Sequence, residues 1–251
     1  RTSEEAEAFE STATLRAAIS AIESAGSTVE ACQRTCESIR TLTGLDGVMV
    51  YKFHKDGHGE VIAEAKDEGW PEYLGLHYPA SDIPEQARAI FLDNWVRMIP
   101  DRDYTPVPLI SRDPSAGPLD LGRSLLRSVS PIHIEYLRNM GVRASLTLSL
   151  IREGQLWGLI AGHHYRGPKH VSFEKRAAAE MLARLVSSQL AHREEQQFVE
   201  YRRRAKVLTQ QLVEHMNASP GLGPDIRGAG EEPVQGLGTL AEQLAVSGDE
   251  R

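Results

Sequence analysis

The stretch RASLTLSLIREGQLWGLIAGHHY, residues 143–165, decides how this chain folds. Small polar and apolar residues alternate over 143–151, which is typical of a β-strand with two different faces. The run over 156–165 carries apolar residues on both faces and predicts a central strand covered on both sides. The intervening REGQ includes a glycine and predicts a tight turn, so the two runs should form an antiparallel hairpin.

Alternation sorts the side chains of this hairpin between the two faces of the sheet. In the first strand, the core face is predicted to carry Ala144, Leu146, Leu148 and Leu150, and the other face carries Arg143, Ser145, Thr147 and Ser149. A polar face of this kind is usually solvated. His163 and His164 end the second strand and point to opposite faces, so they are not expected to chelate one metal ion. The pattern alone favours a structural histidine at this place over a ligand-contacting one.

The rest of the chain predicts helices and a second hairpin around the first. We expect helices over 3–24, 28–42, 83–98, 131–141 and 172–215, and strands over 47–53 and 59–66. A proline-bearing irregular stretch covers 99–122, and loops of this length inside a domain are usually functional or disordered. The fold class is α+β: an antiparallel sheet of at least four strands, flanked by helices and interrupted by a long insertion. This order resembles that of a GAF domain, a fold that binds small molecules on one sheet face.

Three helix starts carry capping signals. In HYPASDIPEQARAIF (77–91), Asp82 with Glu85 three residues later matches a capping box, and Pro84 fits a first turn. Thr28 and Ser172 are the expected N-caps of two other helices. An unbroken helix over 172–215 would extend about 65 Å, so we expect it to join domains, to pair with a partner chain, or both.

Composition narrows the function classes. The net charge of -7 argues against a nucleic-acid-binding surface, and no apolar run is long enough to span a membrane. The two cysteines, Cys32 and Cys36, lie four residues apart on one helix face and are expected to be small semi-buried residues of a cytosolic protein rather than metal ligands. No phosphate-binding glycine loop or nucleophile–base motif is evident, so we expect no enzyme. The start at Arg1 without a signal-peptide pattern suggests a fragment or a processed chain.

Three ordered segments resemble the signature segments of phytochromes, in particular bacterial phytochromes. They are YPASDIPEQAR (78–88), SPIHIEYLRNMGVRASLTLSL (130–150) and GQLWGLIAGHHY (154–165). The resemblance covers roughly residues 28–215 and continues weakly to the end. It implies an N-terminal helix over 1–25, a bilin-binding GAF domain over 26–190, and a connecting helix with the partial start of a PHY domain over 191–251. The proline-bearing insertion resembles the lasso loop through which a segment of a PAS domain is threaded.

The resemblance also implies a function. It predicts a cytoplasmic red/far-red light receptor that binds biliverdin, a linear tetrapyrrole. Photoisomerisation of the bilin would signal through the long helix to an output domain such as a histidine kinase. The implied partners are the chain's own PAS, PHY and output domains and a second copy of the chain, paired through the long helix; no nucleic acid or membrane is implied.

Family roles transfer to positions that match the motifs. Asp82 resembles the aspartate whose backbone carbonyl faces the pyrrole nitrogens, and His133 the histidine beside the inner pyrroles. Arg97 and Arg127 match the arginines that hold the propionates, and His163 matches the histidine that bonds the carbonyl of the terminal ring. The other pocket positions implied are Tyr51, Tyr78, Ile83, Pro84, Phe91, Ser130, Ile132, Tyr136, Ser145 and Thr147.

The covalent anchors of the family do not match this chain. Phytochromes that attach phycocyanobilin or phytochromobilin carry a cysteine just before the motif histidine, where this chain has Ile132. Bacterial phytochromes attach biliverdin through a cysteine that precedes the PAS domain, and Cys32 and Cys36 match neither place. The alternatives are a PAS region that was cut away, a bilin bound without a covalent bond, or no bilin. The last gives the alternative function, a bilin-blind regulatory and dimerisation domain; a GAF domain for a cyclic nucleotide lacks its recognition motif here.

Overall fold

The computed structural model describes residues 3–218 except 114, 116, 118, 125 and 126. The chain divides into two compact units, Arg1–Phe198 and Val199–Arg251. The expected start of a following domain falls largely on 219–251 and so lies outside the described residues. Within the described part, no helix combines the length and the apolar character that crossing a membrane requires.

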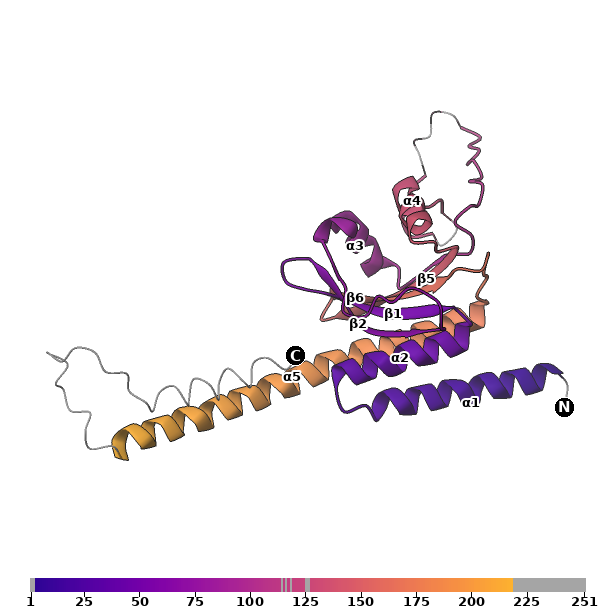
Figure 1. The fold of residues 1–251 in the computed structure, drawn as a ribbon. Coiled ribbons are helices and arrows are strands. Elements are labelled where there is room, and N and C mark those ends of the chain that lie inside the picture. The colour runs from indigo at the N-terminus through magenta and orange to yellow at the C-terminus, as the bar shows by residue number, and fades with distance from the viewer. Residues whose placement is uncertain (1–2, 114, 116, 118, 125–126, 219–251) are drawn as a thin grey trace. The chain divides into compact units, whose positions relative to one another are not determined.

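A six-stranded antiparallel sheet forms the centre of the first unit (Figure 1). Its strands are β1 (Gly47–Phe53), β2 (Gly59–Lys66), β3 (His77–Tyr78), β4 (Val96–Ile99), β5 (Ala144–Arg152) and β6 (Gln155–His164), in the order β3-β2-β1-β6-β5-β4. Both predicted hairpins are confirmed, and β6 is central as its apolar pattern predicted. The short strands β3 and β4 were not predicted.

The helices are α1 (Ser3–Glu23), α2 (Thr28–Thr43), α3 (Glu85–Asp93), α4 (Pro131–Asn139) and α5 (Phe173–Ala218), with a 3-10 turn η1 over Ala80–Asp82. The helix predicted over 83–98 is too long, because α3 ends at Asp93 and the last three predicted residues, 96–98, pair with β5 as part of strand β4. Ser172 caps α5 as predicted, since its hydroxyl accepts from the Lys175 amide at 3.4 Å.

Two of the predicted caps are wrong. Ser27 rather than Thr28 caps α2, and its hydroxyl accepts from the Glu30 amide at 3.1 Å. Asp82 ends the 3-10 turn, and the N-cap position of α3 is Pro84, which makes no side-chain bond. The cause is Pro84 itself: proline disfavours the helical region for the residue before it, and Ile83 accordingly has a non-helical backbone, with φ −126° and ψ 84°.

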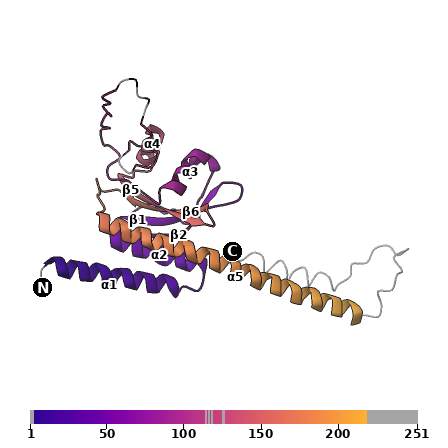
Figure 2. The same ribbon diagram turned by 180° about the vertical axis from the view of Figure 1, so that it is seen from behind.

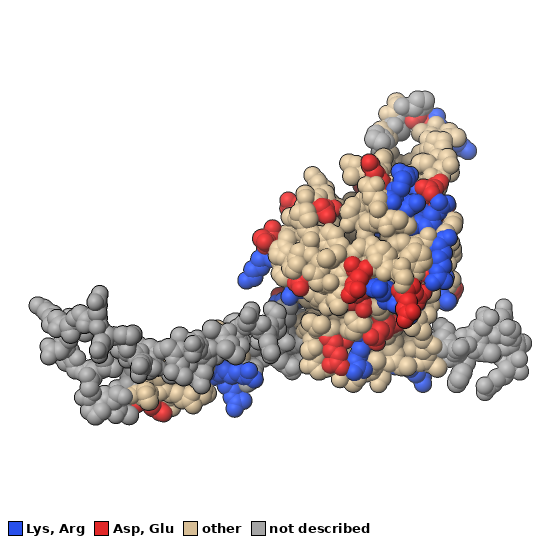
Figure 3. Space-filling model, viewed as in Figure 1, with Lys and Arg blue, Asp and Glu red and all other residues tan. Residues whose placement is uncertain are grey.

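The two faces of the sheet are covered differently. On one face, Val48, Leu148 and Ile160 pack in a large buried cluster with α2 and with α5 as far as Leu190. Figures 1 and 2 show α2 and α5 along this face and α3 and α4 over the opposite face. The surface in Figure 3 mixes basic and acidic side chains. Several of these charges are paired, as Arg143 is with Asp101 at 2.9 Å. The helices therefore close one side of the sheet and leave the other to α3, α4 and the insertion.

Candidate ligand-binding site

The sheet face beneath α3 and α4 presents polar groups from three adjacent strands. Arg97 of β4 lies opposite Thr147 of β5, which lies opposite Ala161 of β6. Ser145 of β5 lies opposite His163 of β6. Residues directly opposite each other in a ladder share a face, so these side chains line one surface. The structure thus brings together four predicted site residues from three strands.

The polar face of β5 is buried rather than solvated. Ser145 and Ser149 are both buried, and the Ser149 hydroxyl donates to the Phe91 carbonyl of α3 at 2.6 Å. Buried hydroxyls require partners because desolvation is otherwise uncompensated. The expectation of a solvated face therefore fails: α3 covers this part of the sheet, and the hydroxyl row belongs to an interior.

An apolar aromatic cluster forms the neighbouring part of the same face. Its fully buried members are Met49, Tyr51, Val61 and Leu159, and its partly buried members include Tyr73, Tyr78, Ile83 and Phe91. The rings of Tyr51 and Tyr78 lie 5.9 Å apart. Four predicted residues, Tyr51, Tyr78, Ile83 and Phe91, thus share one cluster. Met49 was missed, although alternation with Tyr51 along β1 assigns it to this face.

Four basic groups follow one another across the site. Desolvation, and then the charge of Arg127, lower the pKa of Arg97 to about 10. Partial desolvation by the surrounding protein, and then Arg97, lower the pKa of His133. Burial, and then His133, lower the pKa of His163 to about 4, so His163 is neutral at pH 7. Each group is therefore near enough to repel the next.

No carboxylate within the described residues pairs with Arg97 or Arg127. Arg127 donates to the Gly122 carbonyl at 2.5 Å, and the Arg97 guanidinium lies 5.5 Å from the Phe91 ring centroid. Arginine matches carboxylates through two parallel hydrogen bonds. Two partly desolvated arginines without a counter-ion are therefore suited to an anionic ligand with carboxylate groups.

His163 lies in an aromatic frame that sequence reasoning missed. The rings of Tyr73 and Tyr165 approach it edge-on, at 6.1 and 6.2 Å between centroids. The two tyrosine hydroxyls are 3.4 Å apart, and burial raises the pKa of Tyr165. His163 is 7% exposed, and its buried Nδ1 has no hydrogen-bond partner within the described residues. Tyr73 follows no periodic pattern, so only the fold could locate it.

Helix α4 supplies one wall of the site. His133 and Tyr136 lie one turn apart, with nearly parallel rings 6.2 Å apart. Burial, followed by Tyr78 and Asp82, raises the pKa of Tyr136 to about 12. Ser130 is exposed and Ile132 is 79% exposed. These two positions are open to solvent, and so are the predicted site residues Asp82, Pro84, His133 and Tyr136.

Neither cysteine reaches this face. Cys32 and Cys36 are fully buried in the cluster between α2 and the sheet, on the opposite side. Burial raises the pKa of the Cys36 thiol well above its ordinary value. A ligand on the α3–α4 face consequently has no thiol of this chain within reach. The described residues also contain no group of histidine, cysteine and carboxylate side chains arranged to hold a metal ion.

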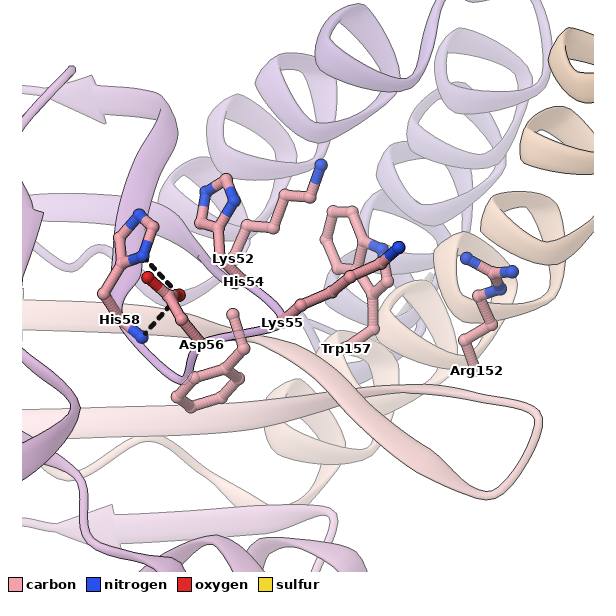
Figure 4. Close-up of a pocket in the computed structure, with 8 residues that line it drawn as sticks. Lys52, His54, Lys55, Asp56, His58, Arg152 and Trp157 are labelled. Carbon is pink, nitrogen blue, oxygen red and sulfur yellow. Dashed lines mark hydrogen bonds and ion pairs between the residues drawn. The ribbon is translucent and has the colours of Figure 1, made fainter.

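A separate hollow of about 550 Å³ lies at the β1–β2 hairpin (Figure 4). It is lined by Lys52, Phe53, His54, Lys55, Asp56, His58, Arg152 and Trp157. The Asp56 carboxylate is held by His58 Nδ1 at 2.6 Å. None of the predicted site residues lines this hollow, so it is distinct from the site described above.

Comparisons with known proteins agree with the geometry. The GAF domain model matches residues 27–190. Cyanobacterial phytochrome B of Nostoc sp. is 45% identical over 199 residues, which cover 78% of this chain and 26% of that protein. The bacteriophytochrome of Xanthomonas campestris is 46% identical over 163 residues, which cover 64% of this chain and 26% of that protein. The chain thus spans about a quarter of the length of these curated relatives.

Solved structures extend the likeness to the three-dimensional fold. The photosensory core module of a Stigmatella aurantiaca phytochrome gives a TM-score of 0.78 at 39% identity, over 98% of this chain and 46% of that one. The chromophore-binding domain of a phytochrome from the same organism gives a TM-score of 0.70 at 45% identity, over 72% of this chain and 60% of that one. Sequence identities of 39% and 45% indicate common ancestry in addition to a shared fold.

Proposed function

The chain belongs to the GAF domain family and is homologous to cyanobacterial and bacterial phytochromes, and on that premise we propose that it is a red/far-red light-sensing module that binds biliverdin. The observation that carries the proposal is the pair of arginines without a carboxylate partner beside buried, neutral His163. Biliverdin carries two propionates and a terminal-ring carbonyl, which need these residue types. When bound, the bilin supplies light absorption and isomerisation of its terminal double bond.

In this proposal, the residues of this chain bind the bilin and orient it. Arg97 and Arg127 hold the propionates, with Ser145 and Thr147 as polar neighbours. His163, neutral at pH 7, has one ring N–H and one acceptor nitrogen, so it can donate to the terminal-ring carbonyl. His133 would lie beside the inner pyrroles and help to keep them protonated, and Asp82 would offer its backbone carbonyl to their N–H groups.

The aromatic cluster limits the space around the terminal ring. Tyr51, Tyr78 and Tyr136 would line the place of that ring, and Phe91 and Ile83 would complete the apolar wall. Burial raises the pKa of Tyr51 to about 12, so its hydroxyl stays protonated and can donate throughout the physiological pH range. The side chains that would line the place of the terminal ring are therefore neutral and largely apolar.

The remaining parts of the proposal concern the longer protein. We propose domain bounds of 1–25, 26–190 and 191–251, with the last belonging to the connection with a PHY domain. A PAS segment threads the insertion, and α5 passes the signal to an output such as a histidine kinase. Exposed Val199, Leu208 and Leu212 on α5 support pairing of two copies through this helix. The module itself is sensory, not catalytic, and acts in the cytoplasm.

The bilin contacts supplied by this chain are noncovalent. Both cysteines are buried on the opposite sheet face, so a thioether, where one forms, uses a cysteine outside this sequence. The second candidate function, a bilin-blind dimerisation domain, is favoured by the same observation. It predicts an associating protein that never acquires a red absorbance band.

A reconstitution experiment tests the proposal. The purified chain is mixed with biliverdin, and its absorbance is measured before and after red light. We expect a red band that changes on illumination. Biliverdin dimethyl ester, which lacks the propionate charges, is the matched ligand control and should bind at least tenfold more weakly, because charge-assisted bonds contribute about 1.5–3 kcal/mol each. No band with either ligand would leave the bilin-blind function; equal binding of both would refute the role of the arginines.

A further inference from the structure

Arg88 of α3 holds the turn that carries Asp82. Its Nε donates to the Ile83 carbonyl at 2.7 Å, and its Nη2 lies 3.3 Å from the Ala80 carbonyl. These two carbonyls flank Asp82 on either side. One guanidinium thereby spans the turn, which matches the fixed fork of donors that arginine offers.

The same side chain connects the turn to the β1–β2 hairpin. Arg88 Nη2 donates to the Gly57 carbonyl at 2.5 Å, and its guanidinium carbon lies 4.5 Å from the Phe53 ring centroid. The hairpin tip and the turn are in close contact, since a Cβ on Gly57 would lie 3.2 Å from the Ala80 Cβ. Gly57 also has φ +87°, a conformation that other residues rarely adopt.

The turn has few other attachments. None of the residues in η1 is buried, and the backbone bond within it runs from the Asp82 amide to the Pro79 carbonyl at 3.1 Å. Among the described residues, Arg88 makes no ion pair with a carboxylate. Its donors are therefore used on backbone carbonyls, and its contribution is to the geometry of the turn rather than to charge balance.

We propose that Arg88 is a positioning residue that fixes Asp82 and Ile83 at the ligand site by tying their turn to the tip of the β1–β2 hairpin. The effect of Arg88 on a ligand rests on the proposed function, in which Asp82 is assigned to the bilin pyrroles. It adds that the tip of this hairpin around Gly57, from which no residue is assigned to the ligand, sets the position of a ligand-contacting carbonyl.

The first test needs no bilin. Hydrogen–deuterium exchange of the full chain is compared for the wild type, Arg88→Gln and Arg88→Lys, with Arg123→Gln as the control because the Arg123 side chain is 84% exposed. We expect exchange in the peptide covering 77–84 to become about tenfold faster in both Arg88 variants, with β5 and β6 unchanged. Lysine should fail to restore protection, because a single ammonium cannot span three carbonyls.

The second test uses biliverdin. Both Arg88 variants should keep the red band, with affinity within about twofold of wild type because Arg97 and Arg127 are intact, while photoconversion under fixed red light falls at least about twofold. Unchanged exchange over 77–84 in folded variants overturns the inference. A wild type without a red band refutes the proposed function but leaves the exchange test valid. If Arg88→Gln does not fold, Arg88→Lys decides, since it keeps the charge and the aliphatic stem over Phe53.

Discussion

Titration of His163 should make the stability of the fold depend on pH. In the unfolded chain a histidine gains its proton near pH 6.5. In the folded chain, burial followed by the neighbouring His133 lowers the pKa of His163 to about 4. Between these values the unfolded state binds more protons than the folded state. The free energy of unfolding therefore falls as the pH falls through this window.

The size of the effect follows from the shift. One pKa unit corresponds to about 1.36 kcal/mol, so His163 removes about 3 kcal/mol of stability between pH 6.5 and 4. Above pH 6.5 both states hold a neutral imidazole, and the contribution to pH dependence vanishes. His133 and His164 also have lowered pKa values, so only the difference between wild type and a His163 variant isolates the effect.

Urea unfolding followed by circular dichroism measures this difference. We compare wild type, His163→Gln, and His170→Gln, which removes an exposed imidazole, at half-unit steps from pH 4 to 7.5. The variant His163→Gln should lose about 3 kcal/mol less than wild type on acidification, and His170→Gln should follow wild type within about 0.5 kcal/mol. Parallel curves for wild type and His163→Gln would refute the assignment of a buried neutral histidine.

Three further predictions concern the site and the core. Arg97→Gln and Arg127→Gln should each raise the dissociation constant for biliverdin about tenfold or more, measured by absorbance titration; unchanged constants would contradict their role in binding carboxylates. Gly59→Ala should lower the free energy of unfolding by about 1–3 kcal/mol, because a Cβ there would lie 1.8 Å from the Tyr51 ring; an unchanged urea midpoint would show that the ring moves without cost. The two buried cysteine thiols should react with a disulfide reagent only after unfolding; rapid labelling of the native protein would exclude the burial described here.

Local sequence patterns were sufficient to predict the strands and turns that depend on residues close in sequence. Alternation predicted both hairpins. The apolar residues on both faces of 156–165 predicted a central strand, because a strand that is buried on both faces does not alternate between polar and apolar residues. The predicted helix start at Asp82 was wrong because a second constraint, the proline at position 84, acts on the same segment. Asp82 and Glu85 satisfy a capping box by spacing, yet Pro84 disfavours the helical region for Ile83, which lies between them.

The missed features depend on contacts distant in sequence. Strand β4 exists because Val96–Ile99 pairs with β5, roughly fifty residues later, and a run of four residues is too short to show a strand period of its own. The Ser149 hydroxyl is buried because α3 lies over it. The frame of His163 includes Tyr73, which lies in an irregular segment between strands. The motif resemblance did nominate most residues that the fold gathers; their contacts with a bilin stay a prediction.

The charge distribution gives the strongest physical reason to expect an anionic ligand. The chain carries an excess of acidic residues, with a net charge of -7, so carboxylates are not scarce. Several are used elsewhere: buried Asp46 pairs with Arg166, and Asp101 pairs with Arg143. Arg97, whose pKa desolvation lowers to about 10, has no carboxylate partner among the described residues. A guanidinium of this kind destabilises the fold, since a desolvated charge without a partner is unfavourable. A ligand that brings two carboxylates would remove this penalty on binding, whereas a neutral ligand of the same shape would retain it.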